Sequence, residues 1–284
     1  MTSTNDYSQR IDRLHKLIAE ADSIMIGAGA GLSTAAGLQY SGEEFEYYFH
    51  PWMERYGIRD LYSSSFYPFK TEEELWACWA MHIWYARYRP EAMPLYRQLL
   101  DVVKDKNYFV ITTNVDGQFE KAGFDNERIF ATQGDYALFQ PKSGSPKQTW
   151  NNREWVEHVL PHIKDCSIPM EMIPHTYDGK PVSMNLRCDD TFVEDAHWHE
   201  QCERYQDFVS DNSDRSLLLL EFGVGFNTPV IIRFPFERMA TEWNHTTLVR
   251  FNRNEPQTYV NGLTRYMIFQ ENTERVLSKL CSST

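Results

Sequence analysis

The stretch Ser23-Ile-Met-Ile-Gly-Ala-Gly-Ala-Gly-Leu-Ser33 places an apolar run directly before three closely spaced glycines. This pattern predicts a buried strand, then a tight turn and the start of a helix. Glycines at such a turn let backbone N–H groups approach a pyrophosphate. The dinucleotide fingerprint G-x-G-x-x-G is broken, because position 32 is Leu and position 34 is Thr. A turn whose glycines serve only close packing therefore remains an alternative.

Strand and helix patterns alternate along the rest of the chain. Further apolar runs are typical of strands buried on both faces, namely Tyr108–Thr112, Ile129–Ala131, Ser216–Phe222 and Thr246–Phe251. Helical patterns cover residues 5–21, 91–105, 116–122 and 272–280. The sequence therefore predicts an α/β fold, a Rossmann-like parallel sheet with helices on both faces.

The composition changes twice along the chain, which suggests a smaller, mostly helical inserted domain. Residues 39–90 are aromatic and Glu-rich, and residues 140–190 are rich in Pro, Ser, Gly and Lys. We therefore expect 39–90 and 136–204 to form the inserted domain. The Rossmann-like domain then takes residues 1–38, 91–135 and 205–284.

The overall composition excludes several classes of partner. A formal net charge of −12 over 284 residues disfavours nucleic acid and anionic membrane surfaces. The longest aliphatic run, Leu217–Leu220, is too short to span a bilayer. Residues 1–10 are polar and lack the apolar core of a signal peptide. The five cysteines, an odd number, are expected to be reduced thiols in a cytoplasmic protein.

A second informative segment, Thr112-Thr-Asn-Val-Asp-Gly117, follows a predicted strand. Ligands of open α/β sheets bind beyond such carboxyl ends. Asn114 can donate and accept hydrogen bonds, and the Asp116 carboxylate can hold an amide-bearing ring. An Asx turn in which Asp116 caps the next helix remains an equal alternative.

Four segments, in chain order, resemble those of sirtuins. Gly29-Ala-Gly-Leu-Ser33 with Gly37 is similar to the family's G-A-G-[I/L]-S-x-x-S-G, with Ala36 replacing the second Ser. Thr113-Asn-Val-Asp-Gly117 is similar to T-Q-N-I-D-G, with Thr113 replacing Gln. Phe222-Gly-Val-Gly225 stands where sirtuins carry G-T-S, and Asn252 with Glu255-Pro256 resembles their adenosine-binding N-x-E-P.

Other segments depart from sirtuin deacetylases. Gln39-Tyr-Ser-Gly42 stands in place of P-D-F-R, and Thr132-Gln-Gly134 in place of the H-G pair whose histidine is the general base. The amide of Gln133 cannot accept a proton at neutral pH, although it can bond to ribose hydroxyls. The C-x-x-C pairs of the sirtuin zinc module are missing, and His197, His199 and Cys202 do not have ordinary zinc-ligand spacing. We therefore expect no bound metal.

This combination resembles the macrodomain-linked sirtuins of microbial pathogens. The resemblance implies that NAD is the co-substrate and that ADP-ribose is transferred to a protein. It also implies an acceptor, a lipoylated glycine-cleavage H-like carrier protein, and a linked macrodomain hydrolase that reverses the mark. An acceptor carboxylate is favoured, since an amine would need a base. NAD-dependent deacylation, a catalytically silent NAD or ADP-ribose sensor and an ordinary dehydrogenase remain the alternatives.

The resemblance assigns site residues as follows. Asn114, Asp116 and Gln133 are expected to be catalytic. The residues expected to bind NAD are Ala28, Gly29, Ala30, Gly31, Ser33, Gln39, Thr113, Asn114, Val115, Asp116, Gln133, Gly223, Val224, Gly225, Asn227 and Asn252. The aromatic 39–67 segment, with Tyr40, Phe45, Tyr47 and Tyr48, either closes over the site or packs as core.

Overall fold

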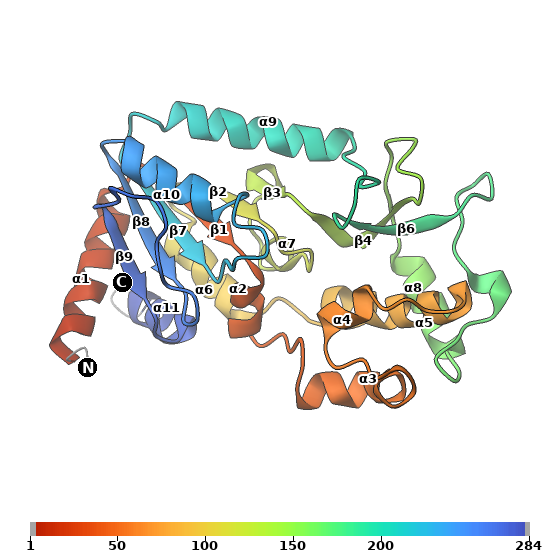
Figure 1. The fold of residues 1–284 in the computed structure, drawn as a ribbon. Helices are drawn as coiled ribbons and strands as arrows, with labels where there is room; N and C mark the ends of the chain where they lie inside the picture. Colours follow the sequence, from red (N-terminus) through yellow and green to blue (C-terminus); the bar gives the residue numbers. More distant parts are fainter. Residues whose placement is uncertain (1–3, 282–284) are drawn as a thin grey trace.

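A six-stranded parallel sheet forms the centre of the larger part of the molecule (Figure 1). The computed structural model describes residues 4–281. The strands, in spatial order, are β3 (Ile129–Ala131), β2 (Asn107–Thr112), β1 (Ser23–Ala28), β7 (Leu217–Phe222), β8 (Thr246–Phe251) and β9 (Tyr266–Phe269). The chain runs outward from β1 to β3 and then crosses to β7, so the strand order reverses between β1 and β7. Ligands of open α/β sheets bind at such a reversal.

Helices cover both faces of this sheet (Figure 1). Ile24 and Ile26 of β1 lie in one apolar core, and Met25 lies in the other. The first core is completed by α1 (Thr4–Glu20), α6 (Pro94–Val103) and α11 (Thr273–Cys281), and the second by α9 (Ala196–Asp211) and α10 (Arg233–Glu242). The predicted α/β fold with a doubly covered parallel sheet is confirmed. The sequence analysis missed the short edge strand β9.

A smaller part of the molecule combines helices with a three-stranded antiparallel sheet. Its strands are β5 (Trp150–Asn151), β4 (Gly134–Pro141) and β6 (Val182–Leu186). Its helices are α3 (Glu43–Tyr56), α4 (Leu61–Ser65), α5 (Glu72–Ile83), η1 (Trp84–Tyr88), α8 (Arg153–Val159), η3 (Leu160–His162) and η4 (Met170–Met172). The expected boundary between residues 204 and 205 lies inside α9. That helix packs as one piece on β3, where the Trp198 and Tyr205 rings contact Phe130 at centroid distances of 5.1 and 5.8 Å.

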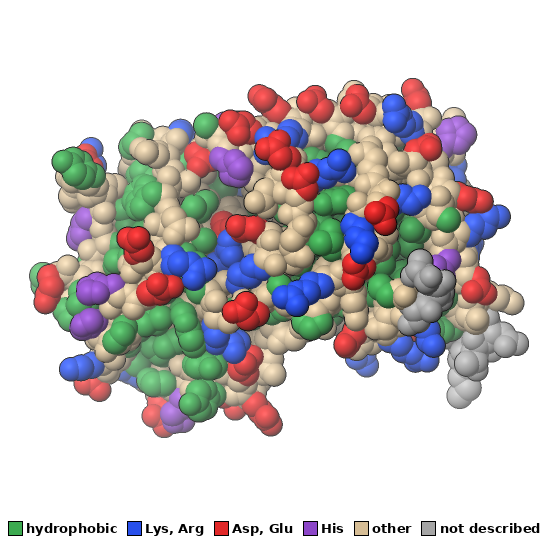
Figure 2. All heavy atoms as spheres, turned by 180° about the vertical axis from the view of Figure 1, so that it is seen from behind, with side chains coloured by type: hydrophobic (Ala, Val, Ile, Leu, Met, Phe, Trp, Pro, Cys, Tyr) green, Lys and Arg blue, Asp and Glu red, His purple; other side chains and the backbone are tan. Residues whose placement is uncertain are grey.

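The surface carries both signs of charge. Figure 2 shows acidic and basic side chains interspersed over the face seen from behind, without a continuous basic area. Among residues 4–281, no helix is both long enough and apolar enough to cross a membrane.

Close contact between glycine backbones joins the turn after β1 to the turn after β7. The N–H of Gly31 donates to the carbonyl of Gly223 at 3.1 Å, and the N–H of Gly223 donates to the carbonyl of Phe251 at 2.9 Å. A Cβ on Gly31 would lie 2.7 Å from the Cα of Gly223. Gly223 itself has a φ of +58°, a conformation that favours glycine. Gly31 and Gly223 are therefore needed for the close packing of the two turns.

We expect Gly223→Ala to lower the free energy of unfolding by about 2–5 kcal/mol, from left-handed backbone strain plus a collision with Gly31. Gly57→Ala is the matched control, because Gly57 has a φ of +70° and no neighbour within 4 Å. The free energy of unfolding of this control should fall by only about 1–2 kcal/mol. Urea unfolding followed by tryptophan fluorescence measures both, and equal losses would contradict the contact.

Candidate functional site

A cleft of about 530 Å³ opens at the carboxyl ends of β1 and β7. Its lining residues are Gly29, Ala30, Gly31, Tyr40, Leu61, Tyr62, Ser65, Phe66, Thr113, Asn114, Val115, Gln133, Tyr136, Leu186, Arg187, Gly223, Val224, Gly225, Asn227, Thr228, Asn252, Asn254 and Glu255. The cleft thus lies at the reversal of strand order. It brings together residues from all four segments that suggested the family.

Four of the predicted binding residues do not line this cleft. Ser33 and Asp116 are buried directly behind it. Ala28 ends β1, and its carbonyl accepts the N–H of Thr113 at 3.0 Å. Gln39 lies apart, since its side-chain oxygen accepts the N–H of Glu44 at 3.1 Å at the start of α3.

A buried hydrogen-bond network fixes the loop after β2. Ser33 donates to Asp116 at 2.5 Å, so its single hydroxyl proton is used. Tyr96 must therefore donate in its 2.8 Å bond to Ser33. The Asn114 amide donates to the carbonyl of Gly29 at 3.0 Å, to Ser33 at 3.1 Å and to Tyr96 at 3.3 Å. The amide that faces the cleft is thereby held in one orientation.

Asp116 forms the Asx turn that was one of the two alternatives left open by the sequence. Its second carboxylate oxygen accepts the N–H of Gln118 at 3.1 Å, at the start of α7 (Gln118–Lys121), as an Asx turn does. Burial raises the pKa of the Asp116 carboxyl above its usual range, and the hydrogen bond from Ser33 offsets part of that rise. Asp116 is only 2% exposed, and hydrogen bonds connect it through Ser33 to Asn114, which lines the cleft.

Gln133 lines the opposite side of the cleft, between β3 and β4. Its carbonyl accepts the N–H of Arg187 at 3.1 Å. Its side-chain amide has no hydrogen bond to another residue in the described range 4–281, and is available to a ligand. No histidine lines the cleft among these residues.

The sequence analysis missed Tyr96 and Arg187. Tyr96 is fully buried on α6, where it looks like an ordinary core residue of an amphipathic helix. Arg187 supplies the one Lys or Arg side chain that lines the cleft within residues 4–281. It pairs with Glu194 at 2.6 Å, and its guanidinium lies 4.3 Å from the centroid of the Phe192 ring. No local pattern distinguishes either residue, because the other residues that line the cleft or join the network come mostly from other segments of the chain.

The 39–67 segment contributes residues both to the lining of the cleft and to the core. Tyr40 lines the cleft, whereas Phe45 is fully buried in the core. Tyr47 points into solvent, with 78% of its surface exposed. Tyr62 on α4 and Phe66 directly after it form an exposed aromatic pair at the cleft, with ring centroids 4.9 Å apart.

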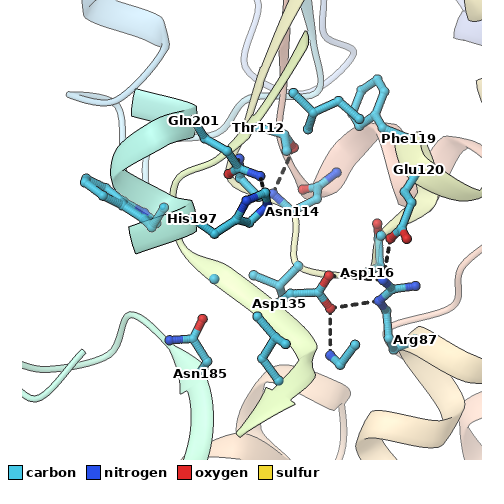
Figure 3. A pocket seen from close by; sticks show the side chains of 18 of the residues that line it. Arg87, Thr112, Asn114, Asp116, Phe119, Glu120, Asp135, Asn185, His197 and Gln201 are labelled. Atoms are coloured by element: carbon cyan, nitrogen blue, oxygen red, sulfur yellow. Dashed lines mark hydrogen bonds and ion pairs between the residues drawn. The ribbon is translucent and has the colours of Figure 1, made fainter. Parts of the chain in front are cut away.

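A second cavity, of about 310 Å³, lies behind the 112–117 loop (Figure 3). Arg87 projects into it from η1 and pairs with Asp135 at 2.8 Å and with Glu120 at 2.7 Å. The guanidinium packs directly against Gly117, where any Cβ would collide with it. Arg87 thereby ties the loop that carries Asp116 to the strand that follows Gln133.

Metal ligands do not gather in the part of the chain that the structure describes. No group of three His, Cys, Asp or Glu side chains there is placed to hold a metal ion.

Solved structures with a similar fold are sirtuins. A Sir2 homologue in complex with NAD matches with a TM-score of 0.61 at 13% identity, over 96% of this chain and 93% of that one. A Sir2 homologue in complex with 2′-O-acetyl ADP ribose matches with a TM-score of 0.61 at 16% identity, over 96% and 95%. These likenesses establish the Sir2-type fold. No family model matches the chain.

Curated relatives identify the family. A protein ADP-ribosyltransferase of Staphylococcus aureus is 32% identical over 251 residues, which cover 88% of this chain and 80% of the relative. The chain belongs to the sirtuin-type protein ADP-ribosyltransferases. This transferase is also 27% identical to a probable bifunctional ADP-ribose hydrolase/ADP-ribosyltransferase of Fusarium oxysporum f. sp. cubense, over 78% of this chain and 39% of that protein. The resemblance inferred from the sequence is confirmed.

We expect Tyr96→Phe to slow ADP-ribosyl transfer roughly tenfold or more, because Asn114 and Ser33 lose the group that orients them. The free energy of unfolding should fall by about 1 kcal/mol. Tyr108→Phe is the control, since the Tyr108 hydroxyl is also mostly buried but accepts only the N–H of Asp125, at 3.0 Å. Initial rates and urea unfolding measure both effects. Equal activity losses in the two variants would contradict a specific role for Tyr96.

Proposed function

We propose that this transferase binds NAD in the cleft between β1 and β7 and transfers ADP-ribose to a carboxylate of a protein acceptor. The observation that carries the proposal is Gln133, whose unbonded amide lines the cleft where sirtuin deacetylases place a basic histidine. An amide cannot take up a proton at neutral pH. A reaction that requires no general base suits this site.

Transfer to a carboxylate is such a reaction. The bond between C1′ of the ribose and N1 of nicotinamide breaks, nicotinamide leaves with the electron pair, and the carboxylate oxygen bonds to C1′. The positive charge of the pyridinium and the negative charge of the acceptor cancel, so no proton has to move. An amine acceptor would instead have to lose a proton to a base.

The residues of the cleft fit a dinucleotide. Gly29, Gly31 and Gly223 line the cleft with backbone alone, and a backbone surface suits close approach to a pyrophosphate. We assign the adenosine half to the 223–227 loop and Asn252. The remaining cleft residues from the predicted set then lie along the pyrophosphate and the nicotinamide ribose.

At the reacting end, the roles follow from the buried network. Asn114, held by three hydrogen bonds, orients the nicotinamide ribose and carboxamide. Asp116 fixes that arrangement through Ser33 and is a positioning residue in this scheme. Gln133 bonds to the ribose hydroxyls from the opposite side.

The acceptor that we propose is a lipoylated glycine-cleavage H-like carrier protein, as the resemblance to macrodomain-linked sirtuins implies. Arg187 at the cleft would attract an acceptor carboxylate. The Fusarium relative, named as a bifunctional ADP-ribose hydrolase and transferase, supports a linked macrodomain hydrolase that removes the mark. We place the reaction in the cytoplasm.

We expect ³²P from labelled NAD to move onto the lipoylated carrier, with Asn114→Ala and Gln133→Ala each lowering transfer roughly 100-fold. Gln206→Ala, on the exposed side of α9, is the matched control and should transfer at the wild-type rate. Release of nicotinamide with deacetylation of an acetyl-lysine peptide, and no labelled carrier, would restore a deacylase. NAD binding without turnover under any condition would favour a sensor.

The linkage to the acceptor should be an ester. Neutral hydroxylamine is therefore expected to release the label, and transfer should persist as the pH falls until acceptor carboxylates protonate near about 4. An amine acceptor would instead slow steadily below about pH 10, and its label would resist hydroxylamine. Either of those results would refute a carboxylate acceptor.

A further inference from the structure

Four charged side chains are fully buried behind the adenosine side of the cleft. Glu221 on β7, Arg250 on β8, and Arg233 and Glu237 on α10 are each 0% exposed, and none lines the cleft. Their two positive and two negative charges balance. Burying ion pairs in this way costs desolvation that apolar residues would avoid, so the network calls for a reason beyond stability.

Arg233 is the member that reaches two cleft loops at once. Its Nη1 donates to the carbonyl of Val224 at 2.7 Å. Its Nη2 donates to the carbonyls of Glu255 and Gln257, both at 2.6 Å. Its guanidinium also lies 4.2 Å from the centroid of the Phe226 ring. The 223–228 loop and the 252–257 loop are thus bridged by one planar group.

The other members bond to one another and to the far side of the second loop. Arg250 donates to both carboxylate oxygens of Glu221, at 2.7 and 2.8 Å, and to the carbonyl of Gln257 at 2.6 Å. Glu237 accepts the N–H groups of Tyr259 and Val260, at 2.8 and 2.9 Å. The nearest carboxylate oxygen to Arg233 lies 3.9 Å away, on Glu221. The hydrogen bonds of Arg233 therefore go to loop carbonyls rather than to an acidic partner.

The bridged loops carry one whole wall of the cleft. Gly225 and Asn227 come from the first loop, and Asn254 and Glu255 from the second. Asn252 adds a smaller link between the loops, because its amide donates to the Val224 carbonyl at 3.0 Å. The reacting end, with Asn114 and Gln133, lies on other segments.

We infer that Arg233 is a positioning residue that sets the spacing of the 223–228 and 252–257 loops and thereby the affinity for the adenosine half of NAD. The inference rests on the proposed NAD site. A lysine cannot replace the guanidinium, because its ammonium is a point charge that does not span three carbonyls on two loops. Loss of the bridge weakens ground-state binding and leaves the chemistry at the nicotinamide end intact. KM for NAD then rises while kcat at saturation is nearly retained.

The test uses the full-length chain with Arg233→Lys and Arg233→Met. Arg265→Met is a matched control, because Arg265 also donates to backbone carbonyls only, those of Thr246, Ala240 and Trp243, around the amino-terminal end of β8. Calorimetry measures Kd for ADP-ribose, and initial rates give KM and kcat. Loss of bonds from a charged donor corresponds to a roughly 10- to 100-fold rise in Kd and KM. Arg265→Met should lower Tm yet leave Kd and KM at wild-type values.

Hydrogen exchange gives a second measurement if Arg233→Met does not fold. In Arg233→Lys, amides of 223–228 and 252–260 should exchange faster while those of β1 and β2 do not. A folded Arg233→Lys with wild-type Kd for ADP-ribose, or a fall in kcat with unchanged KM, would overturn the inference. Failure of the wild type itself to bind ADP-ribose would instead refute the NAD site. The two failures are therefore distinguishable.

Discussion

The contact between the Gly29–Gly31 turn and Gly223 is the constraint on which the rest of the structure depends. It joins the carboxyl ends of β1 and β7, and the bond from Gly223 to Phe251 adds the end of β8. The floor of the cleft and both of its flanking loops start from these points. Because backbones make the contact, it restricts only a few glycine positions. Such a contact leaves most other positions free to vary, and the fold matches a Sir2 homologue with a TM-score of 0.61 at only 13% identity.

The side chains of Asn114 and Gln133, above the floor of the cleft, differ in how many hydrogen bonds hold them in place. Asn114 is held by three hydrogen bonds inside a buried network that includes Ser33, Tyr96 and Asp116. Gln133, opposite, is held only through its backbone. A group that must present one orientation to its ligand gains from being preorganised before the ligand arrives. A side-chain amide such as that of Gln133 can donate to one ribose hydroxyl and accept from another only if no other residue already occupies it. The two arrangements therefore match two different tasks across one cleft.

The sequence predicted what depends on local pattern. The strand before Gly27 and the cleft position of Asn114 follow from apolar runs that end in glycine or Asx residues. Gln39 was placed at the site by alignment with a motif that this chain lacks, and its side chain instead bonds at the start of α3. Tyr96 and Arg233 were missed because their partners lie in other segments: Ser33 is 63 residues from Tyr96, and the partners of Arg233 are on two separate loops. Strands β4 and β6 were also missed, because β4 lacks a regular alternation and β6 alternates over only five residues.

The chemistry explains why this cleft relies on positioning. In the proposed reaction the positive charge of the pyridinium and the negative charge of the acceptor carboxylate cancel, so surroundings of low dielectric favour the reaction without any proton transfer. A general base would not speed this step, whereas a misplaced ribose would slow it strongly. Residues of such a site are then expected to hold geometry, as the network around Asn114 and the bridge at Arg233 do. The side chain of Arg187 is 38% exposed beside Glu194. An acceptor carboxylate arriving from solvent can therefore reach it directly, as it could not reach a fully buried cation.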